Sequence, residues 1–159
     1  LAELMGAASN ADAHHITAPS PGGVGAINCM RTAIANAGLV PSDVTYVNAH
    51  GTSTPLNDAA EAAAIAEVFG DTPPAVTSFK GVTGHALGGA GSLEAVGIVL
   101  GMQKGAIPPT AGYENVDPDM APIDIVVGDA REWTPAPVLS NSFGFGGHNG
   151  CIVIGPPPA

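Results

Sequence analysis

Hydrophobic positions along the chain alternate between two periods, which predicts helices interleaved with strands. From Val24 to Ala37 apolar residues return every three or four positions, as in a helix with one buried face, and Gly38 is its expected end. Short runs rich in β-branched and aromatic residues predict strands at 44–47, 76–79, 124–127, 138–140 and 151–154, and residues 1–8 form a further expected interior strand. This order predicts an α/β layer with a mostly parallel sheet.

A second helix is expected from Asp58 to Phe69, followed by Gly70 as its end. Asp58 and Glu61 have the spacing of a capping box, although Asp replaces the usual Ser or Thr. Residues 10–25 are punctuated by proline and glycine and are therefore expected to form a loop. The glycine-rich segment FGFGGHNG between the last two predicted strands indicates a hairpin-like link.

The stretch from Ser78 to Gly105 joins a strand to an almost entirely apolar helix, and Lys80 and His85 stand among glycines between the two. Its five glycines at 88, 89, 91, 97 and 101 would each cost a helix roughly 1 kcal/mol relative to alanine. Close backbone packing is the expected compensation, so we predict a buried central helix whose N-terminal end faces a reaction site. A membrane span is disfavoured, because Glu94 interrupts a run that is too short to cross a bilayer.

Chemically active side chains follow three of the predicted strands. His50 comes after VTYVN, Lys80 and His85 come after AVTSF, and a glycine loop with Phe143 comes after VLSNS. Ligands gather beyond the carboxyl ends of strands in open sheets, so adjacent strands would bring these groups together. A neutral imidazole could donate a hydrogen bond to a thioester or enolate oxygen, and a nearby lysine cation would lower its pKa and keep it neutral. Taken singly, the same residues could be a solvated lysine and a structural histidine.

Composition argues against several other functions. Fourteen acidic residues against four basic ones give a net charge of -10, which disfavours nucleic acid or an anionic membrane surface as a partner. The chain has no glycine motif for a dinucleotide or phosphate, no local carboxylate pair for glycoside hydrolysis, and no obvious third metal ligand beside His50 and His85. Cys29 and Cys151 are expected to be small buried hydrophobes, and without a secretory signal the expected location is cytoplasmic.

Four motifs in one order resemble the C-terminal half of an elongating β-ketoacyl-[acyl-carrier-protein] synthase, a condensing enzyme of the thiolase superfamily. They are AHGTST, SFKGVTGH continued by ALGGAGSLEA, IPPT, and NSFGFGGHN. The segment DAHHITAPSPGG resembles the one that precedes these motifs in the fatty-acid branch. The resemblance covers the chain as one domain, residues 1–159. It implies half of a thiolase-like fold, with a five-stranded, mostly parallel mixed sheet and helices on both sides.

The resemblance also implies a reaction, the decarboxylative Claisen condensation of an acyl thioester with malonyl-acyl carrier protein in fatty acid elongation. His50 and His85 would promote decarboxylation and stabilise the enolate and the thioester oxyanion. Lys80 would tune His85 and the surrounding hydrogen bonds. The phosphopantetheine arm arrives on the acyl carrier protein, so no resident organic cofactor is expected.

Further site residues are implied in the same way. Thr52 and Thr54 would meet the phosphopantetheine arm, while Phe145 would gate the acyl pocket that Phe143 lines. Glu94 is costly in an apolar helix unless it is paired, and it matches the family's buried glutamate. A structural sodium or potassium ion would be framed by Asn48, Glu94, Ser140 and Asn141.

The nucleophile is the point at which the chain departs from the family. The acyl-bearing cysteine of the family lies at a helix start in the N-terminal half, and neither Cys29 nor Cys151 has that context. We therefore expect this chain alone to be inactive, with the N-terminal half as a partner and a homodimer as the complete enzyme. Three alternatives stay open: half of a polyketide ketosynthase, a non-catalytic fragment that only pairs with another polypeptide, and, more weakly, a degradative thiolase-like enzyme.

Overall fold

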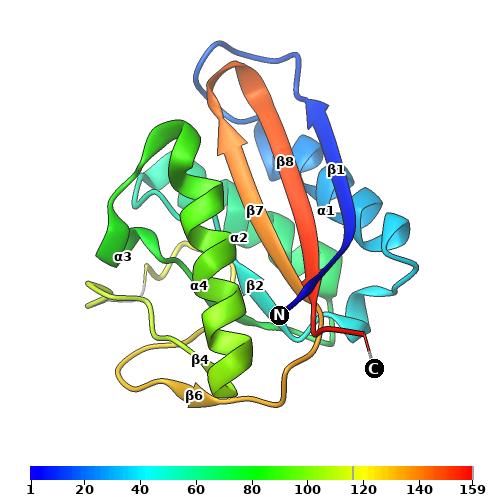
Figure 1. Ribbon diagram of the computed structural model, residues 1–159. Coiled ribbons are helices and arrows are strands. Elements are labelled where there is room, and N and C mark those ends of the chain that lie inside the picture. The colour runs from blue at the N-terminus through cyan, green and yellow to red at the C-terminus, as the bar shows by residue number, and fades with distance from the viewer. Residues whose placement is uncertain (116, 159) are drawn as a thin grey trace.

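A mixed six-stranded sheet forms the centre of the computed structural model, which describes residues 1–115 and 117–158 (Figure 1). Its strands in spatial order are β1 (Glu3–Ala11), β8 (His148–Gly155), β7 (Val138–Gly144), β2 (Tyr46–Asn48), β3 (Ala75–Thr77) and β5 (Asp124–Ile125). The pairs β7–β2, β2–β3 and β3–β5 are parallel, whereas β8 is antiparallel to both β1 and β7. The predicted α/β layer with a mixed, mostly parallel sheet is confirmed. The sheet has six strands, each at a segment that the residue pattern predicts, whereas the family resemblance implied five.

Strand β1 lies at the edge of the sheet and not in its interior. It pairs with β8 alone among the described strands and runs on to Ala11, into residues that were expected to form a loop. β7 and β8 form the predicted hairpin. A separate antiparallel pair consists of β4 (Ala106–Ile107) and β6 (Arg131–Glu132). Short 3-10 turns are η1 (Pro21–Gly23), η2 (Pro41–Asp43), η3 (Leu87–Gly89) and η4 (Phe145–Gly147), the last of which closes the hairpin.

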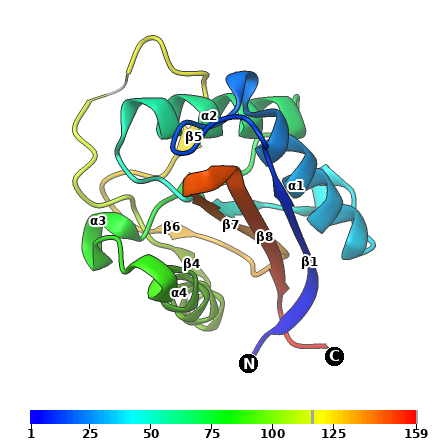
Figure 2. The same ribbon diagram turned by 90° about the horizontal axis from the view of Figure 1, so that it is seen from above.

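Helices cover both faces of the sheet, as Figure 2 shows from above. α1 (Val24–Asn36) and α2 (Pro55–Phe69) lie on one face, and α4 (Ala90–Lys104) lies on the other with the single turn α3 (Lys80–Thr83). Side chains of a strand alternate between the two faces. Val47 and Leu139 therefore pack with α1 and α2, whereas their neighbours Tyr46 and Val138 pack with α4. The amphipathic helix predicted over 24–37 is confirmed.

Helix α2 begins three residues before the predicted start. Pro55 occupies the first helical position, where its missing N–H costs nothing, and Thr54 precedes it with an extended backbone. The capping box predicted from Asp58 and Glu61 is wrong. Asp58 lies within the first turn, and Glu61 is buried and bonds to another segment of the chain.

Two glycines of α4 allow another group to pack against its backbone. A Cβ at Gly97 would lie 2.6 Å from ring atom Cζ of Phe79, and one at Gly101 would lie 2.9 Å from a carbonyl oxygen of β4. The expected compensation by close packing is confirmed at these positions. Gly88 and Gly89 lie outside the helix, in η3, where a Cβ would meet open space.

Helix α4 is buried on one face only. Its sheet-facing residues Ala90, Glu94, Ile98 and Met102 recur every four positions. Leu93, Val96 and Leu100 on the opposite face are 47%, 58% and 49% exposed. The prediction of a buried helix is therefore correct for one face, and the other is an uncovered apolar surface. Across residues 1–115 and 117–158, each helix is too short or too polar to cross a lipid bilayer.

Candidate active site

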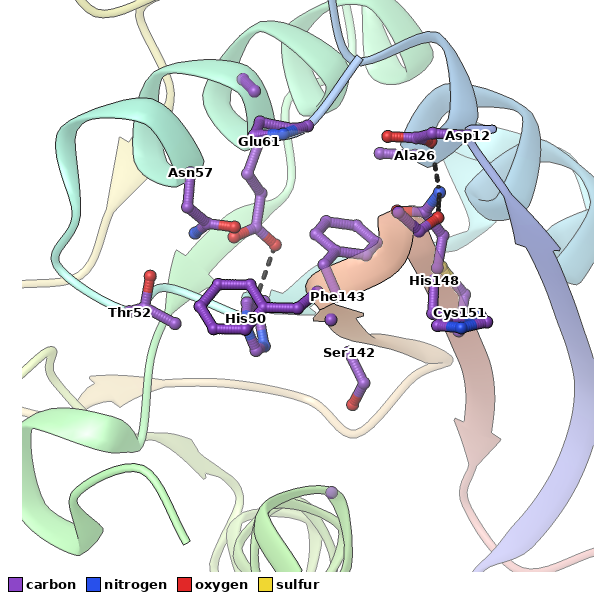
Figure 3. Close-up of a pocket in the computed structure, with 18 of the residues that line it drawn as sticks. Asp12, Ala26, His50, Thr52, Asn57, Glu61, Ser142, Phe143, His148 and Cys151 are labelled. Atoms are coloured by element: carbon purple, nitrogen blue, oxygen red, sulfur yellow. Dashed lines mark hydrogen bonds between the residues drawn. The ribbon is translucent and has the colours of Figure 1, made fainter. Parts of the chain in front are cut away.

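Three adjacent parallel strands end at one edge of the sheet and carry the candidate residues. β7, β2 and β3 are neighbours in that order, and their registers align Asn48 with Ser140 and with Thr77. His50 follows β2, Lys80 follows β3, and Phe143 lies near the end of β7. The strand neighbours predicted from the sequence are therefore present, and their carboxyl ends open onto a cavity of about 1860 Å³ (Figure 3).

The two histidines meet at this edge. The ring centroids of His50 and His85 are 5.4 Å apart, and their planes form an angle of 83°, so the rings pack edge to face. The Phe143 ring also lies beside His50, with a centroid distance of 5.9 Å and an angle of 54° between the ring planes. His50 is 7% exposed, whereas His85 is exposed to solvent. The pair thus has one ring anchored in the protein and one at its surface.

The protonation state of His50 follows from its surroundings. Burial, the largest cause, and the nearby charges of Lys80 and of His85 together lower its pKa from 6.5 to about 4. His50 is therefore a neutral imidazole at pH 7. A neutral ring donates one hydrogen bond and accepts another, as the predicted role requires.

The turn that carries His85 has an unusual backbone. Gly84 has φ +66°, and Leu87 has φ +50°, a value that costs a branched residue conformational energy. Nδ1 of His85 accepts the backbone N–H of Leu87 at 3.2 Å. This bond assigns the proton of the neutral ring to Nε2, because Nδ1 acts as the acceptor. The Nε2–H group is then free to donate to a bound molecule.

Lys80 is buried and forms an ion pair with Glu94 on α4. Their side chains are only 6% and 1% exposed, so each charge depends on the other for compensation. The sequence predicted that Lys80 acts on His85. In the structure its charge is one of the causes that lower the pKa of His50.

Glu61 is a site residue that sequence analysis missed. Its Oε1 accepts the backbone N–H of His50 at 2.8 Å (Figure 3). Its Oε2 accepts the backbone N–H of Gly51 at 2.9 Å. Burial raises the pKa of this carboxyl, and the donated hydrogen bonds oppose that rise. The sequence signal for this role was a lone glutamate among the alanines of a predicted helix. It was missed because Glu61 was interpreted as the partner of Asp58 in a capping box.

The predicted substrate-binding residues line the same cavity. The hydroxyl oxygens of Thr52 and Thr54 are 2.9 Å apart, directly before α2. Phe143 is half-buried beside His50, and Phe145 in η4 is 79% exposed. The structure therefore brings all four residues to one opening together with the histidines.

The four residues predicted to frame a cation do not share one place. Asn48 donates to the Ser140 hydroxyl at 3.0 Å on the face of the sheet that α4 covers, and Glu94 approaches that face from α4. The Asn141 side chain points to the opposite face, where it contacts Met30 and Glu61. Within the described ranges no cluster of three or more His, Cys, Asp or Glu side chains is arranged to bind a metal ion.

Both cysteines are buried, as predicted. Cys29 is 1% exposed and Cys151 is 2% exposed, and neither forms a disulfide. Cys29 donates to the carbonyl oxygen of Ala8 and Cys151 donates to the amide oxygen of Asn141. In the part of the chain that the structure describes, no exposed thiol faces the histidine pair.

Comparison with known proteins gives one consistent result. The model of the family described as "Beta-ketoacyl synthase, C-terminal domain" matches residues 1–114. The 3-oxoacyl-[acyl-carrier-protein] synthase 2 of Synechocystis sp. is 48% identical over 149 residues, which cover 92% of this chain and 36% of that protein. The chain thus spans little more than a third of the length of this curated relative.

Solved structures agree with the sequence relatives. A β-ketoacyl synthase from Burkholderia phymatum superposes with a TM-score of 0.93 at 37% identity, covering 99% of this chain and 38% of that one. A type II PKS ketosynthase solved with its acyl-carrier protein gives a TM-score of 0.93 at 34% identity, covering 99% and 39%. The expected thiolase-like half-fold is therefore confirmed.

Proposed function

Since the chain belongs to the β-ketoacyl synthase family and corresponds to its C-terminal domain, we propose that it supplies the histidine and lysine side of the active site of an elongating synthase. The reaction is the decarboxylative Claisen condensation of an acyl thioester with malonyl-acyl carrier protein. One observation carries the proposal: the edge-to-face pair of His50 and His85 at the mouth of a large cavity, with His50 held neutral at pH 7.

Both histidines act as hydrogen-bond donors in this mechanism. Cleavage of the bond between C2 of the malonyl group and its carboxylate carbon releases CO2 and leaves the electron pair on C2, shared with the thioester oxygen as an enolate. The Nε2–H of His85 and an N–H of His50 donate to that oxygen and stabilise its negative charge. Because the imidazolium form of His50 has a pKa of about 4, the ring is neutral at pH 7, and a neutral imidazole N–H is too weak an acid to protonate the enolate to which it donates a hydrogen bond.

Condensation then forms one bond and breaks another. Carbon C2 of the enolate attacks the carbonyl carbon of the acyl thioester, and the cysteine sulfur leaves as a thiolate that later regains a proton. Cys29 and Cys151 are buried in the core, so this thiol belongs to the proposed N-terminal half of the synthase. This chain alone is accordingly proposed to be inactive.

The remaining cavity residues receive the substrate. Thr52 and Thr54 present adjacent hydroxyls, which suit the amide groups of a phosphopantetheine arm delivered by an acyl carrier protein. Phe143 lines the acyl pocket beside His50, and the exposed ring of Phe145 gates it from the glycine-rich turn η4.

The partners are an acyl carrier protein, the N-terminal half of the synthase, and a second copy of the complete enzyme. The apolar face of α4, formed by Leu93, Val96 and Leu100, is a surface that the N-terminal half would cover. Solved ketosynthases that match this chain include one in complex with its acyl-carrier protein and one in complex with its chain length factor. A cytoplasmic location is part of the proposal, because reduced thiols such as Cys29 and Cys151 are usual there.

A structural sodium or potassium ion is a further part of the proposal. Two buried acceptors, Asn48 Oδ1 and Glu94 Oε2, have no hydrogen-bond partner among the described residues. Amide, hydroxyl and carboxylate oxygens are the donors that hard cations prefer. Asn48, Ser140 and Glu94 would hold such an ion, whose charge would stabilise these oxygens, and the Asn141 side chain would take no part.

The test uses the complete synthase that contains this chain. His50→Ala and Lys80→Ala are expected to lower malonyl decarboxylation at least a hundredfold, the typical effect of losing one preorganised donor in an active site. Near-normal decarboxylation in both variants would refute the roles. Mixing this chain with a cysteine-bearing N-terminal half tests the alternative of a non-catalytic fragment, which predicts complex formation without condensation.

Polyketide synthesis is the second candidate function. It is favoured by the likeness to the ketosynthase solved with a hexaketide, at a TM-score of 0.93. The higher identity to the 3-oxoacyl-[acyl-carrier-protein] synthase 2 of Synechocystis sp. favours fatty acids. Competition between a saturated acyl primer and a poly-β-keto primer on the complete enzyme distinguishes the two, since a fatty acid synthase should elongate the saturated chain faster.

A further inference from the structure

A line of buried polar side chains leads from the backbone of His50 through strand β7 to strand β8. It lies on the face of the sheet that α1 and α2 cover. Glu61 Oε1 accepts both the backbone N–H of His50 at 2.8 Å and the Asn141 amide Nδ2–H at 3.1 Å. The Asn141 amide oxygen accepts the Cys151 thiol at 3.3 Å. These three side chains belong to residues that are at most 3% exposed. The hydrogen bonds thus connect β8 to the strand end that carries His50.

The Glu61 carboxylate and the Cys151 thiol favour the same orientation of the Asn141 amide. An S–H group donates to the amide oxygen, and this turns the NH2 group of Asn141 toward the Glu61 carboxylate. The same NH2 group lies 3.4 Å from the Met30 thioether, a weak acceptor. A flipped amide would instead set its oxygen against the carboxylate oxygen, which is repulsive in a buried site.

Glu61 performs its structural task only as an ionised carboxylate. Two oxygens must each accept one backbone N–H, from His50 and from Gly51. A protonated carboxyl would direct an O–H donor toward one of these N–H donors. Burial favours the protonated form, so an additional donor is needed to favour the ionised one, and the Asn141 amide provides it.

We propose that Asn141, with its amide oriented by the Cys151 thiol, is a positioning residue that keeps Glu61 bonded to the backbone of His50 and Gly51 and thereby fixes the His50 imidazole. The structural part of this inference stands by itself. Its catalytic part rests on the proposed function.

Amide hydrogen exchange in the full-length protein tests the structural part. Asn141→Leu keeps the branched outline of the side chain and removes the donor, so exchange at His50 and Gly51 is expected to accelerate about tenfold, as for the loss of about 1.4 kcal/mol of local protection. The amide of Ala49 bonds to β3 and should exchange as before. Leu139→Ala is the matched control, because this buried residue lies two positions earlier on the same face of β7 and no bond joins it to Glu61.

Cys151→Ala is a second variant that leaves Asn141 in place. It is expected to accelerate the same two amides by a smaller factor, and it serves if Asn141→Leu does not fold. The inference would be overturned if the amides of His50 and Gly51 exchanged no faster in Asn141→Leu and Cys151→Ala than in the Leu139→Ala control. This result would hold whatever the activity of the enzyme.

The pH dependence of malonyl decarboxylation tests the catalytic part. Removing the amide donor raises the pKa of Glu61, so the acidic limb of the rate profile should move to higher pH in Asn141→Leu. The pH profile of Leu139→Ala should keep its midpoint, because a loss of stability alone does not change the pKa of Glu61. Faster exchange in Asn141→Leu together with an unmoved acidic limb would refute the catalytic part. If exchange is faster in Asn141→Leu but the wild-type enzyme has no decarboxylase activity, the proposed function is refuted and the positioning role of Asn141 stands.

Discussion

Replacing Lys80 with methionine in the full-length protein tests how much the buried ion pair between Lys80 and Glu94 contributes to stability. The Lys80 and Glu94 side chains are 6% and 1% exposed, so the substitution leaves a buried carboxylate without its counter-ion. Breaking such a pair costs about 3–5 kcal/mol, and we expect the free energy of unfolding in urea to fall by that amount. The exposed pair of Arg31 and Glu67, with side chains 50% and 61% exposed, is the control, and Arg31→Met should cost under about 1 kcal/mol.

A double variant separates stability from chemistry. Lys80→Met combined with Glu94→Met replaces both charges with apolar side chains and should recover most of the lost stability. It should not recover malonyl decarboxylation if the ammonium supports the histidines. NMR titration provides a third measurement: the pKa of His50 should rise in Lys80→Met, yet stay below 6.5 because burial, the larger cause, persists. A cost no greater than that of Arg31→Met, or an unchanged pKa of His50, would refute the reasoning.

Three further predictions concern single residues. The pKa of His50 is lowered to about 4 in the folded protein, so as the pH falls the unfolded chain takes up the proton of this histidine before the folded protein does. The free energy of unfolding should therefore decline as the pH falls from about 6.5 to 4. In urea unfolding measured across this pH range, His50→Asn should show a smaller decline. Gly97→Ala should destabilise the protein by about 1–3 kcal/mol, since its Cβ would overlap the Phe79 ring, whereas Gly88→Ala meets open space and should leave the melting temperature within a degree or two. Tyr46→Phe removes a buried hydroxyl that hydrogen-bonds to a threonine on β3 at 2.7 Å, and a loss of about 1 kcal/mol in urea unfolding is expected; no loss would show that the bond has no net value.

The convergence of the site was predictable because local patterns determine it. The β-branched runs before His50 and Lys80 define strands, and parallel strands in an open sheet present their carboxyl ends at one edge. The face on which each side chain lies was not predictable. Ser140 and Asn141 are adjacent, so they point to opposite faces, and only the register of β7 decides which of them meets α4.

Two other errors have a tertiary cause. Glu61 matches a local capping pattern, but its carboxylate bonds to backbone groups ten and eleven residues earlier, a pairing that exists only after β2 and α2 have packed. The edge position of β1 has the same origin. Residues 1–8 have the small and apolar character of an interior strand, and their place beside β8 depends on a partner more than 130 residues away.

The unequal anchoring of the two histidines has a consequence for ligand design. The backbone of His50, directly after β2, is hydrogen-bonded to Glu61 on α2, so a compound that stacks on its ring meets a preorganised surface and loses little entropy on that side. His85 sits on an exposed turn with a left-handed Leu87, and a compound that depends on it must also immobilise that turn. Inhibitors that are extended from the His50 ring toward Phe143 should therefore gain more affinity per added atom than inhibitors that are extended toward the turn that carries His85.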